Sequence, residues 1–208
     1  MTQSLIVNCS LNTLVKNDEL LKAVTKFSGC TVLKFGDIHF GYEIDKDTDA
    51  VVISGSAARI VNPSHRDMFA GTVDLIKHLD LPILSICHGH QLLCWSFGAG
   101  VGSLAEPVKD RFEEIRVVEV DEIFSGFEEF ETIPLAQSHY DYVLRESLGE
   151  AGFILLADSN SCEVEAVKHR QYPFYGVQFH PERTNLKGET HLEGHQIIEN
   201  FYRNVVKR

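Results

Sequence analysis

The 208-residue chain is long enough for one α/β domain with a sizeable core, and its 44% hydrophobic and 24% charged residues are ordinary for a globular protein. A formal net charge of -11 argues against nucleic acid or an anionic membrane surface as the main partner. No apolar run reaches the ~18 residues of a membrane span. The N-terminal residues do not resemble a signal peptide, and the five cysteines are scattered along the chain. Both features indicate a cytoplasmic protein.

The first half of the chain alternates short apolar strands with amphipathic helices. Asn17 has the side chain of a helix cap, and apolar residues on one helical face follow it up to Gly29. A second helix opens with a capping box from Ser64 to Asp67 and runs to Leu79. The sequence predicts three strands, at Leu5–Val7, Thr31–Phe35 and Ala50–Ser54, of which the third is a continuous apolar run.

The second half is rich in β-branched residues and ends in a helix through Ile197 and Val205. Its predicted strands are Ile115–Val120, Thr132–Gln137, Phe153–Ala157 and Glu163–Val167. No flexible linker precedes them, so we interpret them as an antiparallel extension of one domain over residues 1–208. The predicted fold is α/β, a flavodoxin-like three-layer sandwich with a mostly parallel central sheet.

The stretch from Leu81 to Leu93 joins the two halves and carries the first chemical signal. An apolar strand opened by Pro82 stops at Cys87, and a helix begins at once. This is the geometry of a nucleophile elbow with cysteine in place of serine. A helix N-terminus favours the thiolate, and the N–H of His88 would face an oxyanion. The alternative is a quiet buried thiol.

The second signal is His180-Pro181-Glu182, which follows the apolar run from Phe174. Pro181 cannot continue a strand ladder, so His180 and Glu182 lie at a strand end. An imidazole base and the carboxylate that orients it are what a thiol nucleophile needs. A structural histidine at the end of a strand is the alternative.

Two stretches, Ile86-Cys87-His88-Gly89-His90-Gln91 and Gly176-Val177-Gln178-Phe179-His180-Pro181-Glu182, resemble the signatures of the class I (triad-type) glutamine amidotransferases. The resemblance covers nearly the whole chain. It implies that Cys87, His180 and Glu182 form a catalytic triad, with glutamine as the substrate and ammonia delivered to a synthetase partner.

Within that family, Gln137-Ser138-His139-Tyr140-Asp141 is similar to a segment of the GMP synthetase glutaminases. The resemblance implies that Ser138, His139 and Tyr140 bind substrate, and that Gln91 contacts it. A solvated turn, and a glutamine that only stabilises the elbow, are the alternatives.

Gly55 follows the third predicted strand and can bring a second oxyanion N–H close to the substrate, since it lacks a Cβ. An ordinary strand-end turn is the alternative. The chain departs from the family pattern at Ser54-Gly55-Ser56, where Gly-Gly-Pro is usual, and at Asn8-Cys9-Ser10, Ser85 and Arg183.

No metal site is expected, because His191 and His195, one helical turn apart, have no third ligand nearby. The sequence has no Walker loop and no pyrophosphatase motif. We therefore expect no cofactor in this chain, and ATP and Mg²⁺ on a partner ATP-pyrophosphatase or synthetase subunit.

The leading hypothesis is thus a glutaminase subunit for GMP synthesis. Three alternatives remain open. A stand-alone γ-glutamyl hydrolase or peptidase would use the same triad, and a glutaminase subunit could serve another amination pathway. A redox role of Cys87 would need no pair such as His180 and Glu182.

Overall fold

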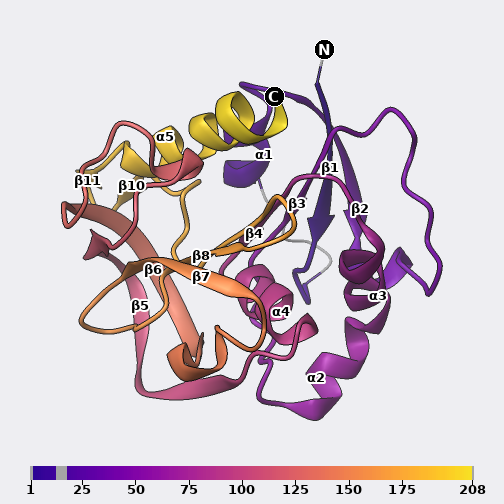
Figure 1. Ribbon diagram of the computed structural model, residues 1–208, viewed down its shortest axis with the longest axis horizontal. Coiled ribbons are helices and arrows are strands. Elements are labelled where there is room, and N and C mark those ends of the chain that lie inside the picture. The colour runs from indigo at the N-terminus through magenta and orange to yellow at the C-terminus, as the bar shows by residue number, and fades with distance from the viewer. Residues whose placement is uncertain (1, 13–17, 208) are drawn as a thin grey trace.

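A nine-stranded mixed sheet forms the centre of the computed structural model, which describes residues 2–12 and 18–207 (Figure 1). The strand order is β2-β1-β3-β4-β9-β8-β7-β5-β6. The strands are β1 (Gln3–Asn8), β2 (Gly29–Lys34), β3 (Ala50–Ile53), β4 (Ile83–Ile86), β5 (Val101–Val117), β6 (Thr132–Val143), β7 (Phe153–Asp158), β8 (Ala166–His169) and β9 (Phe174–Val177). A separate hairpin pairs β10 (Asn185–Leu186) with β11 (Glu189–Thr190).

The sheet has a parallel half and an antiparallel half that meet at β9. Strands β2, β1, β3, β4 and β9 pair in parallel, whereas β9, β8, β7, β5 and β6 pair antiparallel. The predicted α/β fold with an antiparallel extension is therefore confirmed. Because β4 and β9 are neighbours, residues distant in sequence that follow these strands lie at the same sheet edge.

Helices cover both faces of the parallel half. The helices are α1 (Asp18–Val24), α2 (Pro63–Met68), α3 (Ala70–His78), α4 (His88–Ser96) and α5 (Glu193–Asn200). Apolar residues of α3 and α4 form one core cluster with Leu5 and Val7, while those of α1 and α5 form a second with Ile6. Strands buried on both faces are mostly apolar, and β3, which is buried along its whole length, accordingly has no polar residue. Figure 1 shows α1 beside α5, away from α3 and α4.

The predicted helix up to Leu79 is interrupted at Phe69, between α2 and α3. Phe69 is fully buried, and its ring stacks on Phe35 with centroids 4.3 Å apart. The predicted capping box was wrong, because Asn62 caps α2 by accepting a hydrogen bond from the Ser64 N–H (3.1 Å). Pro63 occupies the first helical position, where its missing N–H costs nothing. The Asn17 cap falls outside the described residues.

Other element ends also differ from the predictions. The strand expected at Glu163 begins at Ala166, and the one expected to reach His180 ends at Val177. The final helix continues from α5 into a π-helical segment, Phe201–Val206.

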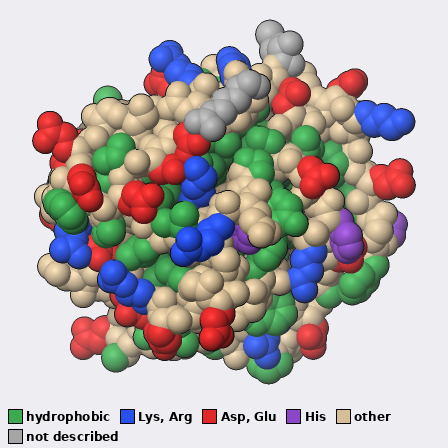
Figure 2. All heavy atoms as spheres, in the orientation of Figure 1, with side chains coloured by type: hydrophobic (Ala, Val, Ile, Leu, Met, Phe, Trp, Pro, Cys, Tyr) green, Lys and Arg blue, Asp and Glu red, His purple; other side chains and the backbone are tan. Residues whose placement is uncertain are grey.

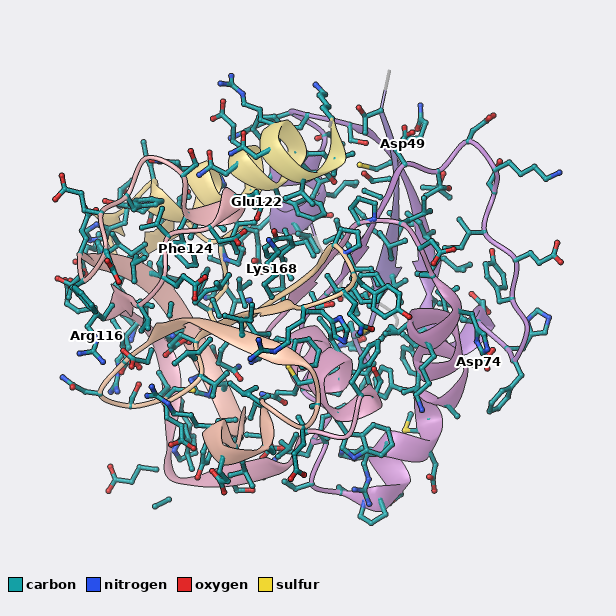
Figure 3. The ribbon with its side chains drawn as sticks, in the orientation of Figure 1. Asp49, Asp74, Arg116, Glu122, Phe124 and Lys168 are labelled. Carbon is teal, nitrogen blue, oxygen red and sulfur yellow. The ribbon has the colours of Figure 1, made fainter. Side chains whose placement is uncertain are left out.

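Charged side chains of both signs are interspersed on the face in Figure 2 rather than gathered into one patch. Several charged side chains of the protein form ion pairs with one another. Lys168 Nζ donates to Asp121 Oδ2 (2.8 Å) and Glu122 Oε2 (2.6 Å), and Figure 3 labels two of these residues. Within residues 2–12 and 18–207, the helices lack the length and apolar character that a membrane crossing requires.

Candidate active site

Cys87 sits on a strained turn between β4 and α4. Its backbone has φ 52° and ψ -107°, a region that a residue with a Cβ rarely adopts. The Cys87 N–H donates to the carbonyl oxygen of Val177 in β9 (2.7 Å), which fixes the turn to the neighbouring strand. Gly89 lets α4 approach the sheet closely, since a Cβ there would lie 2.6 Å from the Ile53 oxygen. The predicted elbow is present, with the thiol at the N-terminus of α4.

His180 and Glu182 lie beside this turn. His180 Nδ1 is 2.8 Å from Glu182 Oε1, and the ring also hydrogen-bonds the Cys87 side chain. Because Glu182 occupies Nδ1, Nε2 is the nitrogen left for the thiol. The His180 N–H donates to the Ala136 oxygen of β6 (2.8 Å), which anchors the turn that carries the base. The three predicted triad residues therefore form one continuous chain of contacts.

Electrostatics separates His180 from the other histidines around the elbow. Burial lowers the pKa of His88 to about 4 and that of His90 to about 3, and it also lowers the pKa of His139. Burial acts in the same direction on His180, but the charges of Glu182 and Cys87 outweigh it and raise the pKa of His180 well above its ordinary value. Of these four histidines, His180 is therefore the one whose environment favours the protonated ring at neutral pH.

A cavity of about 260 Å³ opens over the thiol. All of the predicted site residues line it except Gly55 and Glu182. Sites for drug-sized ligands span about 300–1,000 Å³, so this cavity suits a smaller molecule, of the size of an amino acid.

Gly55 lies against two triad residues. A Cβ at this position would be 3.0 Å from His180 Cε1 and 3.5 Å from Cys87 Cβ. The Ser54 hydroxyl accepts from the Cys9 N–H (2.9 Å) and donates to the Gly55 oxygen (3.1 Å), which ties the loop to the end of β1. A side chain at position 55 would therefore crowd the His180 ring.

The Gln91 side chain is held within the protein. Its Nε2 donates to the Asp141 carbonyl oxygen (2.7 Å) and to Gln178 Oε1 (3.0 Å). These bonds join α4 to β6 and to the segment after β9. They favour the alternative that Gln91 stabilises the site, and they leave its oxygen for a ligand in the cavity.

The segment Ser138–Tyr140 of β6 lies where its pairing with β5 is irregular. The register shifts between Ser103 and Val108 and again between Val108 and Arg111, opposite this segment. At both shifts β5 has more residues than β6, so part of β5 is left unpaired, and such irregularities often lie beside functional sites. The Ser138 carbonyl oxygen is 3.6 Å from Cys87 Sγ. Ser138, His139 and Tyr140 thus bring backbone groups to the cavity.

Two ion pairs at the cavity were not predicted. Arg59 Nη2 lies 2.5 Å from Asp141 Oδ1, and Arg183 Nη1 lies 2.8 Å from Asp110 Oδ1. Asp141 belonged to a recognised segment, but Arg59 follows no motif that would have marked it. Asp110 adopts φ 39° at the second irregularity of β5, a backbone feature that no local pattern revealed.

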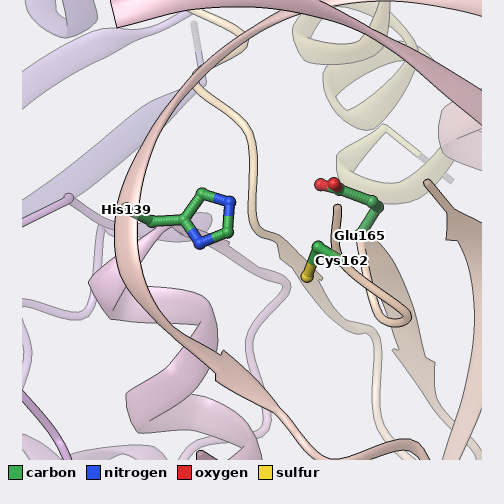
Figure 4. A group of neighbouring side chains, drawn as sticks. All are labelled: His139, Cys162 and Glu165. Carbon is green, nitrogen blue, oxygen red and sulfur yellow. The ribbon is translucent and has the colours of Figure 1, made fainter. Parts of the chain in front are cut away.

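The His139 ring does not point toward substrate space. Figure 4 shows it facing Cys162 and Glu165, and ligand atoms of the three buried residues lie within 4.8 Å of one another. These are zinc-binding residue types, and the group is the one of its kind in the described part of the chain. Glu165 already accepts from Ser159 (2.7 Å) and Gln137 (2.6 Å), and His139 Nδ1 lies 3.0 Å from the Asp141 carbonyl oxygen. The group is therefore part of a buried hydrogen-bonded cluster.

The histidine pair near the C-terminus has separate partners. His191 Nε2 lies 2.9 Å from Glu189 Oε1, and His195 Nδ1 lies 3.1 Å from Lys26 Nζ. His191 also precedes α5, so the two rings do not share a helix.

Comparison with known proteins places this site in a family. The family model Glutamine amidotransferase class-I matches residues 16–205. The glutamine-hydrolyzing GMP synthase subunit of Methanothermobacter thermautotrophicus is 35% identical over 159 residues, 76% of each chain. The protein of the same name from Archaeoglobus fulgidus is 38% identical over 137 residues, 66% of this chain and 68% of that one.

Solved structures agree on the fold. A Thermoplasma acidophilum protein superposes with a TM-score of 0.80 at 24% identity, covering 97% of this chain and 92% of its own. A glutamine amidotransferase from Thermotoga maritima gives a TM-score of 0.69 at 18% identity, over 87% and 76%. With a family model that spans nearly the whole sequence and relatives above one-third identity, the chain belongs to the class-I glutamine amidotransferases.

Proposed function

We propose that this chain is the glutaminase subunit of a two-chain GMP synthetase, in which Cys87, His180 and Glu182 hydrolyse the side-chain amide of glutamine. The observation that carries the proposal is the series of contacts from Glu182 through His180 to Cys87, ending at a cavity of amino-acid size. The archaeal relatives, which are named as glutamine-hydrolyzing GMP synthase subunits, support the choice of pathway.

In the first half-reaction, the Cys87 sulfur, which has already given its proton to His180, attacks the glutamine δ-carbon. The carbonyl oxygen becomes an oxyanion, which accepts from the N–H groups of Gly55 and His88. Collapse expels ammonia, which leaves with the proton that His180 held, and a γ-glutamyl thioester remains on Cys87.

In the second half-reaction, neutral His180 takes a proton from water and the hydroxide oxygen attacks the thioester carbon. The carbon–sulfur bond breaks, glutamate leaves, and His180 returns the proton to Cys87. Glu182 holds Nδ1–H throughout, so that Nε2 always faces the sulfur. Gln91 and the backbone of Ser138, His139 and Tyr140 hold the substrate.

The ammonia then passes to a partner subunit, which is an ATP-pyrophosphatase or synthetase that carries ATP and Mg²⁺. Ammonia released to water at neutral pH becomes ammonium, which is no nucleophile, so transfer requires an enclosed path. The complex of this chain and its partner would work in the cytoplasm, where the free thiols of this chain stay reduced.

The test is ammonia release from glutamine with and without the synthetase subunit, ATP, Mg²⁺ and the purine nucleotide acceptor. We expect a steep rise when the complete set is present, and none with Cys87→Ala. Hydrolysis of γ-glutamyl peptides at a typical enzyme rate of ~10 per second, unchanged by any partner, would favour the stand-alone hydrolase.

A further inference from the structure

The turn that carries the catalytic base is packed against the first turn of α5. Gly194 is the second residue of that helix, and a Cβ there would lie 2.5 Å from the carbonyl oxygen of Pro181. The next residue, His195, forms a hydrogen bond with the backbone of Glu182. Two consecutive residues of α5 therefore contact the turn on which His180 and Glu182 lie.

Lys26 determines which ring nitrogen of His195 makes that bond. Lys26 lies in the turn that follows α1, and Figure 1 shows α1 beside α5. Its ammonium nitrogen lies 3.1 Å from His195 Nδ1. An ammonium group has donors only, so Nδ1 accepts, and the proton of the neutral ring is on Nε2. The Nε2–H is thus the donor to the Glu182 carbonyl oxygen.

The surroundings of His195 favour this neutral ring. Burial, followed by the charge of Lys26, lowers the pKa of His195. The backbone hydrogen bond and the charge of Glu182 act in the opposite direction and are outweighed. At neutral pH the ring therefore has one acceptor and one donor, which is the state that can bridge Lys26 and Glu182.

The Glu182 carboxylate depends on support from its backbone. Its Oε1 binds His180 Nδ1 (2.8 Å), whereas Oε2 is buried and has no hydrogen-bond partner among the described residues. The one hydrogen bond described for this side chain is therefore to the ring that it must orient. A misplacement of about 1 Å in a catalytic group can cost about 100-fold in rate. The backbone of Glu182 must accordingly be held firmly.

We propose that His195, with its tautomer fixed by Lys26, is a positioning residue that holds Glu182 in place beside His180. The contacts run from Lys26 to His195, then through the Glu182 backbone to His180 and Cys87. His195 fixes the backbone of Glu182, as the Glu182 carboxylate fixes the His180 ring. This inference rests on the proposed glutaminase function and adds two residues that do not contact the substrate cavity.

His195 can be reached from outside the catalytic cavity. It lines a second cavity, of about 710 Å³, together with Lys26, Phe27 and side chains of α5. Removing the ring would leave room there for free imidazole, which has the same donor and acceptor. 1-Methylimidazole fills the same space but has no N–H. The two compounds therefore separate a lost hydrogen bond from lost packing.

The test uses iodoacetamide on the chain alone, because alkylation needs neither glutamine nor a partner subunit. The Cys87 sulfur bonds to the methylene carbon and iodide leaves. The pH at which the rate rises reports the formation of the ion pair between this thiolate and the His180 imidazolium. Mass spectrometry identifies the alkylated residue. Burial raises the pKa of each of the other four thiols, which are Cys9, Cys30, Cys94 and Cys162.

The two decisive variants differ by one methylene group. The amide nitrogen of glutamine reaches the position of Nε2, so His195→Gln keeps a donor for the Glu182 carbonyl. The asparagine side chain ends at the position of Nδ1, so His195→Asn keeps the contact with Lys26 and loses the one with Glu182. His191→Asn is the matched control, because His191 also precedes this part of α5 but pairs with Glu189 (2.9 Å). Thermal melting shows whether each variant is folded.

We expect His195→Asn to move the rise in alkylation rate to higher pH by about 0.5–1 unit, the effect of one lost hydrogen bond. His195→Gln and His191→Asn should match the wild type. His195→Ala should behave like His195→Asn, and imidazole should restore its profile while 1-methylimidazole should not. In the complete complex, kcat for glutamine should fall about 10- to 100-fold in His195→Asn, with KM unchanged.

Equal profiles for His195→Asn and His195→Gln, whether both are shifted or both match the wild type, would overturn the role of His195 and leave the glutaminase proposal intact. An NMR spectrum that places the His195 proton on Nδ1, read from two-bond ¹H–¹⁵N correlations that disappear in His195→Gln, would overturn it as well. A complete complex that is alkylated normally but releases no ammonia from glutamine would overturn the glutaminase proposal. The alkylation profiles would then still show whether His195 positions Glu182.

Discussion

Replacing Glu165 with glutamine tests how the buried cluster beneath the cavity is charged. Glu165 is fully buried, and burial raises the pKa of its carboxyl from an ordinary 4.5 to about 8, although Ser159 and Gln137 donate to it. The carboxyl is therefore protonated in the folded protein at neutral pH. Two polar atoms of the neighbouring residues, His139 Nε2 and Gln137 Oε1, lack a partner among the described residues.

The sign of the pH effect follows from proton binding. Between the unfolded pKa near 4.5 and the folded pKa of about 8, the folded chain holds one proton more than the unfolded chain. Stability therefore falls as pH rises through this window, by about 1.4 kcal/mol per pH unit, or about 3 kcal/mol between pH 5 and pH 7. Glutamine has nearly the same shape and is neutral at every pH, so Glu165→Gln should lack this fall.

The assay is urea unfolding of wild type and Glu165→Gln at both pH values. The free energy of unfolding of the variant minus that of the wild type should rise by about 3 kcal/mol from pH 5 to pH 7. Other titrating groups are common to both proteins and largely cancel in this difference. Exposed Glu150→Gln is the control and should show no comparable change. A difference for Glu165→Gln that does not vary with pH would refute the reasoning.

Three further predictions concern the candidate site. Glu182→Gln should lower kcat/KM for glutamine hydrolysis by about 10³- to 10⁴-fold because the His180 tautomer is no longer fixed, and steady-state kinetics with the partner subunit would show whether it does. Gly55→Ala should cost about tenfold or more in kcat, since its Cβ presses on the His180 ring at 3.0 Å, whereas Gly36→Ala, with open space around it, should match the wild type. Zinc should leave the melting temperature unchanged; a rise that disappears in Cys162→Ser would show that the cluster binds the ion.

Local patterns were sufficient for the parts of the site that a short segment builds. The elbow at Cys87 follows from an apolar run that meets a helix start, and His180 and Glu182 follow from one proline turn. Both depend on residues adjacent in sequence. The family resemblance then supplied roles for residues that carry no chemical signal of their own, such as Gln91.

Features that depend on distant partners were not predictable in this way. Arg59 and Asp141 are 82 positions apart, and nothing near either residue indicates the other. The break in the helix at Phe69 arises from its stacking on Phe35, which is a tertiary contact. The inward direction of the His139 ring likewise depends on Cys162 and Glu165, which lie in the loop between β7 and β8.

The strand β6 lies at the edge of the sheet and contacts three residues of the candidate site. The β5–β6 ribbon pairs with the rest of the sheet through two residue pairs, Arg116 with Asp158 and Val117 with Ala157. Yet β6 bonds the His180 backbone through Ala136, the Cys87 thiol through Ser138 and the Gln91 amide through Asp141. The edge strand β6 therefore holds the base, the nucleophile and Gln91 in one arrangement, and a substitution that displaced β6 would disturb all three at once.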